Sequence, residues 1–330
     1  MFKRKPQKGT EEQQALPRIS ITGALGKLNS EADFVQIDAN WREIKGLDEI
    51  LQGLYLNLSR SAQKRPFSGC GLLLTGGSDR QGLVSIAYPS ADRAGRLYPF
   101  VIFNRLSDAG FYYKPEALFV SGLCSIRKGL DHALERGETP NSGWLVSLGA
   151  LPEHQSYVDF RNAKRNAMSL AEEILLDDFL IAAAGHDQNR RIDFMVGIVL
   201  LITALKQGRV HRAYHGIWLP LPLMEKNENV VAFWLQLLSA IMASNHQWRP
   251  DVAWTSSVGN SRLFVFTKPL TSTGLQATID DESAVSGFLG WQDIASSEDA
   301  HTRVKQLYSS WQNRKGINLL DVAIEWYQLL

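Results

Sequence analysis

The stretch PSADRAGRLYPF, residues 89–100, places charged side chains, a glycine and two prolines between two short apolar runs. The runs at residues 83–88 and 98–103 are typical of strands, because they are apolar and are bounded by turn-forming residues. We therefore predict that this stretch forms a loop that joins two strands and exposes its charged side chains. A charged loop held between strands favours recognition over core packing.

Asp92, Arg93 and Arg96 are the charged residues of this predicted loop, and they admit two compatible interpretations. In the first, all three are exposed for recognition. In the second, Asp92 caps a tight turn and pairs with Arg93 or Arg96, while Gly95 supplies a positive backbone φ. Arginines held by a carboxylate in this way would present planar, pre-oriented donors to an acidic or phosphorylated partner surface.

Ser90 in the same loop opens a catalytic alternative. A serine, an aspartate and an arginine close together can act as nucleophile, orienting acid and anion clamp. No histidine or lysine lies close in sequence to Ser90, so a hydrolase or phosphatase-like site with Asp92 would need one of the seven histidines from a distant segment. A longin- or roadblock-like scaffold that binds a GTPase is a third possibility, which alternating strands and helices permit but no motif requires.

The stretch GKLNSEADFV, residues 26–35, precedes this loop in the chain. Together the two stretches resemble the paired signatures of the TagF family, also called ImpM, of type VI secretion system-associated proteins. The family pattern reads Gly-Lys-Leu-Pro-x-x-Gly-Asp-Phe-Val and, later, Pro-Ser-x-Asp-x-x-Gly-Arg-x-Phe/Tyr-Pro. The second signature is nearly complete here, whereas Asn29 and Ala32 replace a proline and a glycine of the first. The resemblance covers about residues 20–150.

The resemblance implies a bacterial, cytoplasmic accessory protein that represses assembly of the type VI secretion system after translation. It implies protein–protein contacts with the forkhead-associated scaffold component of the apparatus, without catalysis. We predict that the partner-binding residues are Ser90, Asp92, Arg93, Gly95, Arg96, Lys27 and Asp33. For Lys27 and Asp33, the alternative is a structural role at the start of a helix or the end of a strand.

The composition is that of a globular protein without a broad electrostatic field. Of the 330 residues, 45% are apolar and 21% are charged, which suffices for one large domain or two ordinary ones. The net charge of +1 argues against a nucleic acid or an anionic membrane as partner. Cys70 and Cys124 lack the close spacing of a metal site. The basic, then polar start of the chain lacks the apolar middle of a secretory signal, and residues 195–205 are too few for a membrane helix, so we expect a cytoplasmic location.

The common catalytic and metal-binding motifs are missing from the sequence. It contains no phosphate-binding loop, nucleophile elbow, His-Glu-x-x-His helix or Cys-x-x-Cys pair. His211 and His215 stand four apart but lie in a predicted turn, and the adjacent Asp177 and Asp178 point to different parts of a helix. Residues 280–282 form an acidic run typical of a solvated turn. We therefore expect no metal, no cofactor and no enzyme activity.

Apolar periodicity predicts strands and helices that alternate along the chain. Predicted helices lie at residues 47–58, 115–134, 169–180, 195–205, 229–243, 304–311 and 319–330. Predicted strands lie at residues 71–75, 83–88, 98–103, 143–148, 217–219, 251–255 and 262–267. The glycine-rich turn between the first two strands makes them a predicted hairpin.

These elements predict an α/β (α+β) protein of two lobes, each with a mixed or largely antiparallel sheet flanked by helices. Residues 1–18 are a predicted disordered tail, because their composition is polar and charged. Residues 19–184 form a predicted TagF-like N-terminal lobe, and residues 185–330 a predicted C-terminal α/β lobe. The boundary is placed at the polar break GHDQNR, residues 185–190.

Overall fold

The structure is a computed structural model, which describes residues 18–60, 69–75, 81–107, 119, 160–211, 213–222, 227–242, 248–255, 261–279, 287–295, 297–314 and 316–329. The predicted tail therefore lies outside the described residues, apart from Arg18. The same holds for the predicted helix at residues 115–134, apart from Phe119, and for the predicted strand at residues 143–148.

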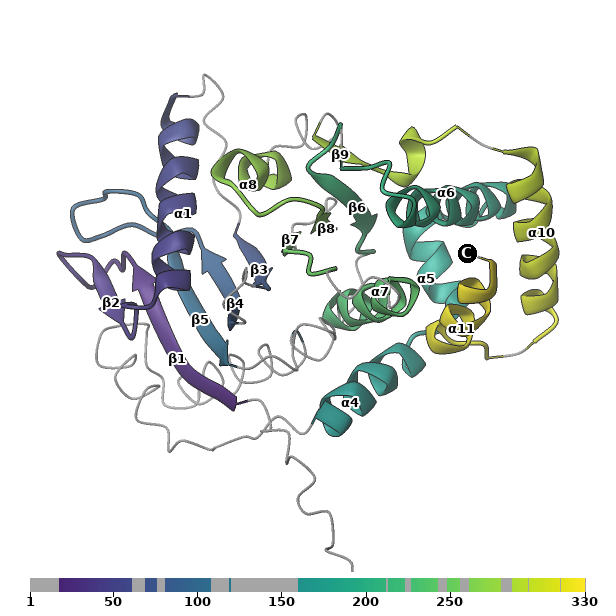
Figure 1. The fold of residues 1–330 in the computed structure, drawn as a ribbon, viewed down its shortest axis with the longest axis horizontal. Helices are drawn as coiled ribbons and strands as arrows, with labels where there is room; N and C mark the ends of the chain where they lie inside the picture. The colour runs from purple at the N-terminus through teal and green to yellow at the C-terminus, as the bar shows by residue number, and fades with distance from the viewer. Residues whose placement is uncertain are drawn as a thin grey trace, which may run out of the picture.

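Nine strands among the described residues form one mixed sheet (Figure 1). They are β1 (Arg18–Gly26), β2 (Val35–Ile37), β3 (Cys70–Leu74), β4 (Gln81–Tyr88), β5 (Phe100–Ser107), β6 (Gly216–Pro220), β7 (Val252–Thr255), β8 (Arg262–Phe266) and β9 (Phe288–Leu289). Their order across the sheet is β2-β1-β5-β4-β3-β7-β8-β6-β9. Neighbouring strands are antiparallel, except that β6 and β9 are parallel. The predicted α/β class and the largely antiparallel pairing are confirmed.

The sheet runs without a break through both predicted lobes. Strand β3 pairs with β7, with Leu72 opposite Ala253. Gly71 lies opposite Trp254, and a Cβ at this glycine would fall 1.9 Å from the tryptophan ring, so glycine leaves the room that the ring needs. The sequence predicted a separate sheet for each lobe, but strands from both predicted lobes form one sheet. A strand at a buried edge needs a partner for its backbone N–H and C=O groups, and the β3–β7 pair supplies it. The division of the chain at residue 184 stays a prediction.

One face of the sheet is covered by two helices that contact each other, α1 (Arg42–Arg60) and α8 (Ser272–Ile279). The first predicted helix is α1, extended by several residues at its N-terminus. Leu47, Leu51 and Leu54 of its predicted apolar stripe are fully buried, whereas Ile50 and Leu58 of the same stripe are partly buried. Because α1 begins soon after β2, its N-terminal half lies near the loops described below.

The remaining helices among the described residues bury a second apolar core against the other face of the sheet and lie in the right-hand half of Figure 1. They are α4 (Phe160–Glu172), α5 (Leu176–Ala184), α6 (Gln188–Lys206), α7 (Asn227–Ile241), the short 3-10 helix η2 (Trp291–Asp293), α10 (Glu298–Gln312) and α11 (Leu319–Leu329). The predicted break at residues 185–190 includes the turn between α5 and α6. Gly185 ends α5 with a φ of 85°, and the Asp187 side chain caps α6 by accepting from the Arg190 N–H.

Candidate functional site

Two loops meet at one end of the N-terminal strands. We call residues 27–34 the first loop and residues 89–99 the second loop. Strand β1 pairs with β2 on one side and β5 on the other, so that Gly26 lies opposite both Val35 and Phe100. Both loops therefore leave the sheet at the same end of neighbouring strands. In Figure 1 the second loop extends at the left-hand side, near β2.

Gly26 is required at the base of both loops. Its φ of 125° is one that side chains rarely adopt, and a Cβ there would fall 2.0 Å from the carbonyl oxygen of Pro99. The glycine that opens the first signature is therefore needed for the close approach of the two loops.

Asp92 of the second loop is buried, with none of its side chain exposed. Its Oδ1 accepts hydrogen bonds from the backbone N–H groups of Ala94 at 3.0 Å and Arg96 at 2.8 Å. Its Oδ2 accepts from Arg96 Nε at 2.6 Å and lies 3.1 Å from Lys27 Nζ in the first loop. The prediction that Asp92 is exposed is wrong, because four donors from two loops surround its carboxylate. The alternative, in which Asp92 caps a turn, is confirmed.

The turn that Asp92 caps is tight and regular. The N–H of Gly95 donates to the Asp92 carbonyl at 2.9 Å, and the N–H of Asp92 donates to the Arg96 carbonyl at 3.1 Å. Gly95 has a φ of 78°, in the left-handed region that favours glycine, as predicted. An isolated β-bridge between Ala91 and Leu97 closes the turn. Asp92 pairs with Arg96 and not with Arg93, which resolves the choice left open by the sequence.

Both arginines of the second loop bind backbone carbonyls of the first. Arg93 donates from Nη2 to the Ser30 carbonyl, and its backbone N–H donates to the Glu31 carbonyl at 2.9 Å. Arg96 donates from Nη2 to the Ala32 carbonyl at 3.0 Å. Both side chains nevertheless remain exposed, to 61% for Arg96. The guanidinium groups are thus oriented by the first loop while they face solvent.

Ser90, Lys27 and Asp33 have different environments. The Ser90 hydroxyl donates to the Lys27 carbonyl at 2.6 Å, so these two residues join the loops. The Lys27 side chain is only 17% exposed, because its ammonium group reaches the buried Asp92 carboxylate. Asp33 is exposed on the first loop. Of the residues predicted to bind a partner, Ser90, Lys27 and Asp92 therefore hold the loops together.

Tyr98, in the second signature, connects the second loop to α1 through a hydrogen bond. It was predicted to begin a strand, but β5 begins at Phe100, and Tyr98 instead donates its hydroxyl proton to the Asp48 carboxylate. Burial, together with that carboxylate, raises the pKa of Tyr98 above its usual range. Its ring also packs against Phe34 of the first loop, with 5.1 Å between ring centroids. The tyrosine of the signature therefore links both loops to α1.

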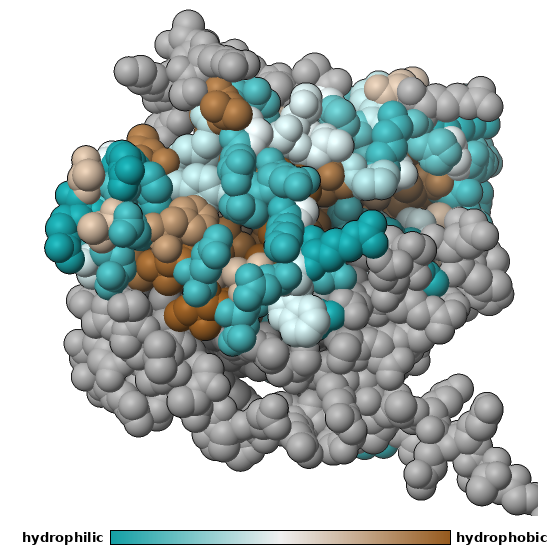
Figure 2. Space-filling view, turned by 60° about the vertical axis from the view of Figure 1, so that its left-hand side comes forward, coloured by the Kyte–Doolittle hydropathy of each residue, from teal (hydrophilic) through white to brown (hydrophobic). Residues whose placement is uncertain are grey.

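The surface around the loops mixes polar and apolar side chains. Figure 2 brings the left-hand side of Figure 1 forward and shows hydrophobic residues lying among hydrophilic ones on this side of the molecule. Leu97 is 70% exposed beside Arg96, and Phe34 is 36% exposed. These two apolar residues were not among the predicted site residues. Their positions inside the two signatures were the available signal.

The ionised form of Asp92 is strongly favoured. Burial alone would raise its pKa, but hydrogen bonds from the Arg96 backbone, the Lys27 ammonium and the Arg96 guanidinium outweigh burial and lower it to about 2. A carboxylate in this state accepts hydrogen bonds and does not donate a proton near neutral pH. The arrangement can hold cationic groups in fixed positions.

The other sequence candidates do not converge on a site within the described part of the chain. No group of three or more described His, Cys, Asp or Glu side chains could hold a metal ion. His211 is exposed in a turn before β6, as predicted. Asp177 Oδ1 lies 3.5 Å from Arg191 Nη1 of α6. The acidic run at residues 280–282 lies outside the described residues. None of the described helices has both the length and the apolar composition to cross a bilayer.

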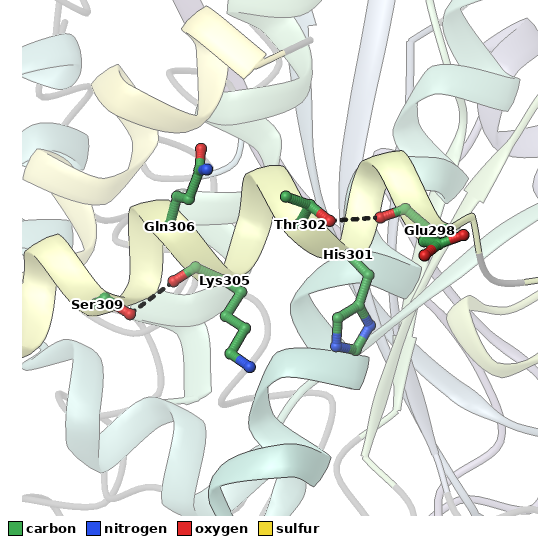
Figure 3. Close-up of a pocket in the computed structure, with 6 residues that line it drawn as sticks. All are labelled: Glu298, His301, Thr302, Lys305, Gln306 and Ser309. Atoms are coloured by element: carbon green, nitrogen blue, oxygen red, sulfur yellow. Dashed lines mark hydrogen bonds between the residues drawn. The ribbon is translucent and has the colours of Figure 1, made fainter.

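A shallow hollow lies along one face of α10 (Figure 3). It is lined by Glu298, His301, Thr302, Lys305, Gln306 and Ser309. The hydroxyls of Thr302 and Ser309 donate to carbonyls of the same helix, and His301 Nδ1 lies 3.7 Å from Asp193 Oδ1 of α6. All six lining residues come from one helix, and none is fully buried. The two-loop site is therefore the stronger candidate.

Residues 23–120, which contain both loops, match the family model of the TagF N-terminal domain, described as type VI secretion system-associated. No curated protein matches the sequence. Among solved structures, the crystal structure of PA0076 from Pseudomonas aeruginosa PAO1 is similar at 20% identity and a TM-score of 0.30, over 40% of this chain and 62% of that one. The match thus spans less than two thirds of the solved chain. The match over residues 23–120 supports the assignment of this part of the chain to the TagF family of type VI secretion system-associated proteins.

Proposed function

We propose that the protein is a non-catalytic, cytoplasmic regulator that represses assembly of the type VI secretion system after translation. It acts by docking on the forkhead-associated scaffold component of the apparatus. The observation that carries the proposal is the joining of the two family signatures into one hydrogen-bonded surface. That surface presents two exposed arginines, Arg93 and Arg96.

The arginines suit protein recognition because their orientation is set before a partner arrives. Arg96 is held between the Asp92 carboxylate and the Ala32 carbonyl, and Arg93 is held by the Ser30 carbonyl. Ordering a long side chain on binding costs about 0.5–1.5 kcal/mol, and pre-ordered side chains avoid much of that cost. A planar guanidinium in a fixed position matches the two oxygens of a carboxylate. The partner surface should therefore offer acidic side chains.

The contacts of the loops also support a binding role over a catalytic one. The Ser90 hydroxyl donates to the Lys27 carbonyl, and Asp92 is occupied by four donors. A nucleophile would need its proton directed to a base. The hydrolase-like and GTPase-binding alternatives stay predictions that no described contact favours.

The test is the double variant Arg93→Glu/Arg96→Glu, measured for binding to the purified forkhead-associated scaffold component by isothermal titration calorimetry. Reversing two pre-oriented charges at the centre of an interface should weaken binding by about 100-fold. Circular dichroism and thermal unfolding establish that the variant is folded.

The matched control is Arg303→Glu/Lys305→Glu on the exposed side of α10, which changes the net charge by the same amount. It should bind within about twofold of the wild type, because surface charges far from an interface contribute little. Equal weakening by both double variants, or no binding by the folded wild type, would contradict the proposal.

A further inference from the structure

Asp92 is the residue of the two-loop site that cannot itself touch a partner. Its side chain has no exposed area, and each carboxylate oxygen already receives two donors. A carboxylate has about four acceptor positions, so this one is saturated within the protein. Any effect of Asp92 on docking must pass through the groups that it holds.

We infer that Asp92 is a positioning residue that joins the two loops and sets the direction of the Arg96 guanidinium. This inference rests on the proposed function for its binding consequence. The two carboxylate oxygens have different partners. Oδ1 caps the turn within the second loop, and Oδ2 binds Arg96 Nε and the Lys27 ammonium of the first loop.

Arg93 provides an internal comparison, because the Asp92 side chain does not bond to it among the described contacts. Arg93 is held by the Ser30 carbonyl through Nη2 and by the Glu31 carbonyl through its backbone N–H. If Asp92 acts through Arg96, its removal should be coupled to removal of Arg96 and independent of removal of Arg93.

The substitution Asp92→Asn separates the two roles of the carboxylate. The amide oxygen of asparagine can still accept from the Ala94 and Arg96 N–H groups, so the turn keeps its cap. The amide NH2 would replace Oδ2 and face the donors of Arg96 and Lys27, where two donors cannot bond. The variant therefore removes the contacts of Oδ2 with Arg96 Nε and Lys27 Nζ with little change in volume, while the hydrogen bonds of Ser90 and Arg93 to the first loop remain.

The first measurement is hydrogen–deuterium exchange of the free, full-length protein. Asp92→Asn should raise exchange about tenfold in residues 27–34 and 89–99, while exchange in α6 and α10 stays unchanged. Asp299→Asn, the acid of an exposed i,i+4 pair with Arg303 on α10, makes the same charge change and should leave both loops unaffected. Unchanged exchange in the first loop would overturn the inference.

The second measurement is a double-mutant cycle on binding to the purified forkhead-associated scaffold component. Asp92→Asn alone should weaken binding about tenfold, but less than about twofold when Arg96→Ala is already present. With Arg93→Ala present, the loss should again be about tenfold. A purely structural role of Asp92 would cause the same loss in every background, and that result would overturn the inference.

The two measurements separate this inference from the proposed function. If the folded wild type does not bind the scaffold component, the proposed function fails. The joining of the loops by Asp92 is then decided by the exchange measurement alone, with the same supporting and overturning results.

Discussion

The two-loop site and the α10 face both present charged side chains to solvent, but they hold them in different ways. In the two-loop site, Arg93 and Arg96 are bound by carbonyls of the first loop, and Arg96 also by a buried carboxylate. On α10, the neutral hydroxyls of Thr302 and Ser309 bond to carbonyls one turn away in the same helix, and His301 Nδ1 lies 3.7 Å from Asp193 Oδ1 of α6. In the two-loop site, partners from another segment thus fix the direction of exposed charged side chains.

This difference has a physical consequence for binding. A side chain held only by its own helix keeps most of its rotamer freedom, and it must lose that freedom when a partner binds. The loop arginines lost it when the protein folded. Contacts with another segment therefore pre-order the loop arginines, which is what the proposed docking function requires.

The largest loss of stability is expected from Gly26→Ala. This variant tests whether the two-loop site depends on the glycine at the end of β1, where both loops leave the sheet. A side chain at this φ of 125° would also meet the Pro99 carbonyl, so we expect a loss of stability of about 3 kcal/mol. Urea unfolding measures the loss. The control is Gly46→Ala in α1, where a Cβ has no heavy atom within 4 Å and should stabilise the helix by up to about 1 kcal/mol. Equal stability of both variants would contradict the prediction, because it would show that the close approach of Gly26 to Pro99 is not needed for stability.

A smaller effect is expected from acid, because the pKa of Asp92 is lowered from 3.8 to about 2 by folding. A carboxyl with a lowered pKa in the folded state stabilises the protein above its unfolded pKa, and this contribution disappears as the pH falls through the folded pKa. The difference in melting temperature between the wild type and Asp92→Asn should therefore be constant above about pH 5 and shrink between pH 4 and pH 2. A difference that does not change with pH would contradict the assignment of the stabilising charge to Asp92.

The smallest effect is expected from Lys305→Ala on the α10 face. The side chain is exposed, so the free energy of unfolding should change by less than about 0.5 kcal/mol. Binding to the scaffold component should also stay within about twofold of the wild type, as titration calorimetry can measure. A tenfold loss of binding would make α10 a second contact surface and would weaken the contrast between the two regions.

Much of the fold could be predicted from local patterns. The helix with Leu47, Leu51 and Leu54 on one face is α1, and the strand predicted at residues 83–88 is β4, because side-chain periodicity follows backbone geometry. The pairing of β3 with β7 could not be predicted. It joins Gly71 to Trp254 across a long stretch of chain, and no local pattern selects one distant strand over another.

For the candidate site as well, features that depend on neighbouring residues could be predicted, and features that depend on distant residues could not. The capped turn from Asp92 to Arg96 was predicted because aspartate and glycine favour it within five residues. The burial of Asp92 was not predicted, since it depends on Lys27 from the other loop. Tyr98 was missed as a site residue because its partner, Asp48, lies on α1.

By itself, the sequence determined the two signatures, the resemblance to the TagF family and the tight turn, because each depends on residues close together in the chain. Tertiary structure alone decided that the two loops form one surface and that Asp92 points inward while Arg93 and Arg96 point outward. The physical reason is that β1 pairs with both β2 and β5 and thereby brings the ends of three strands together. Only after that pairing can a carboxylate of one loop meet the ammonium group of the other.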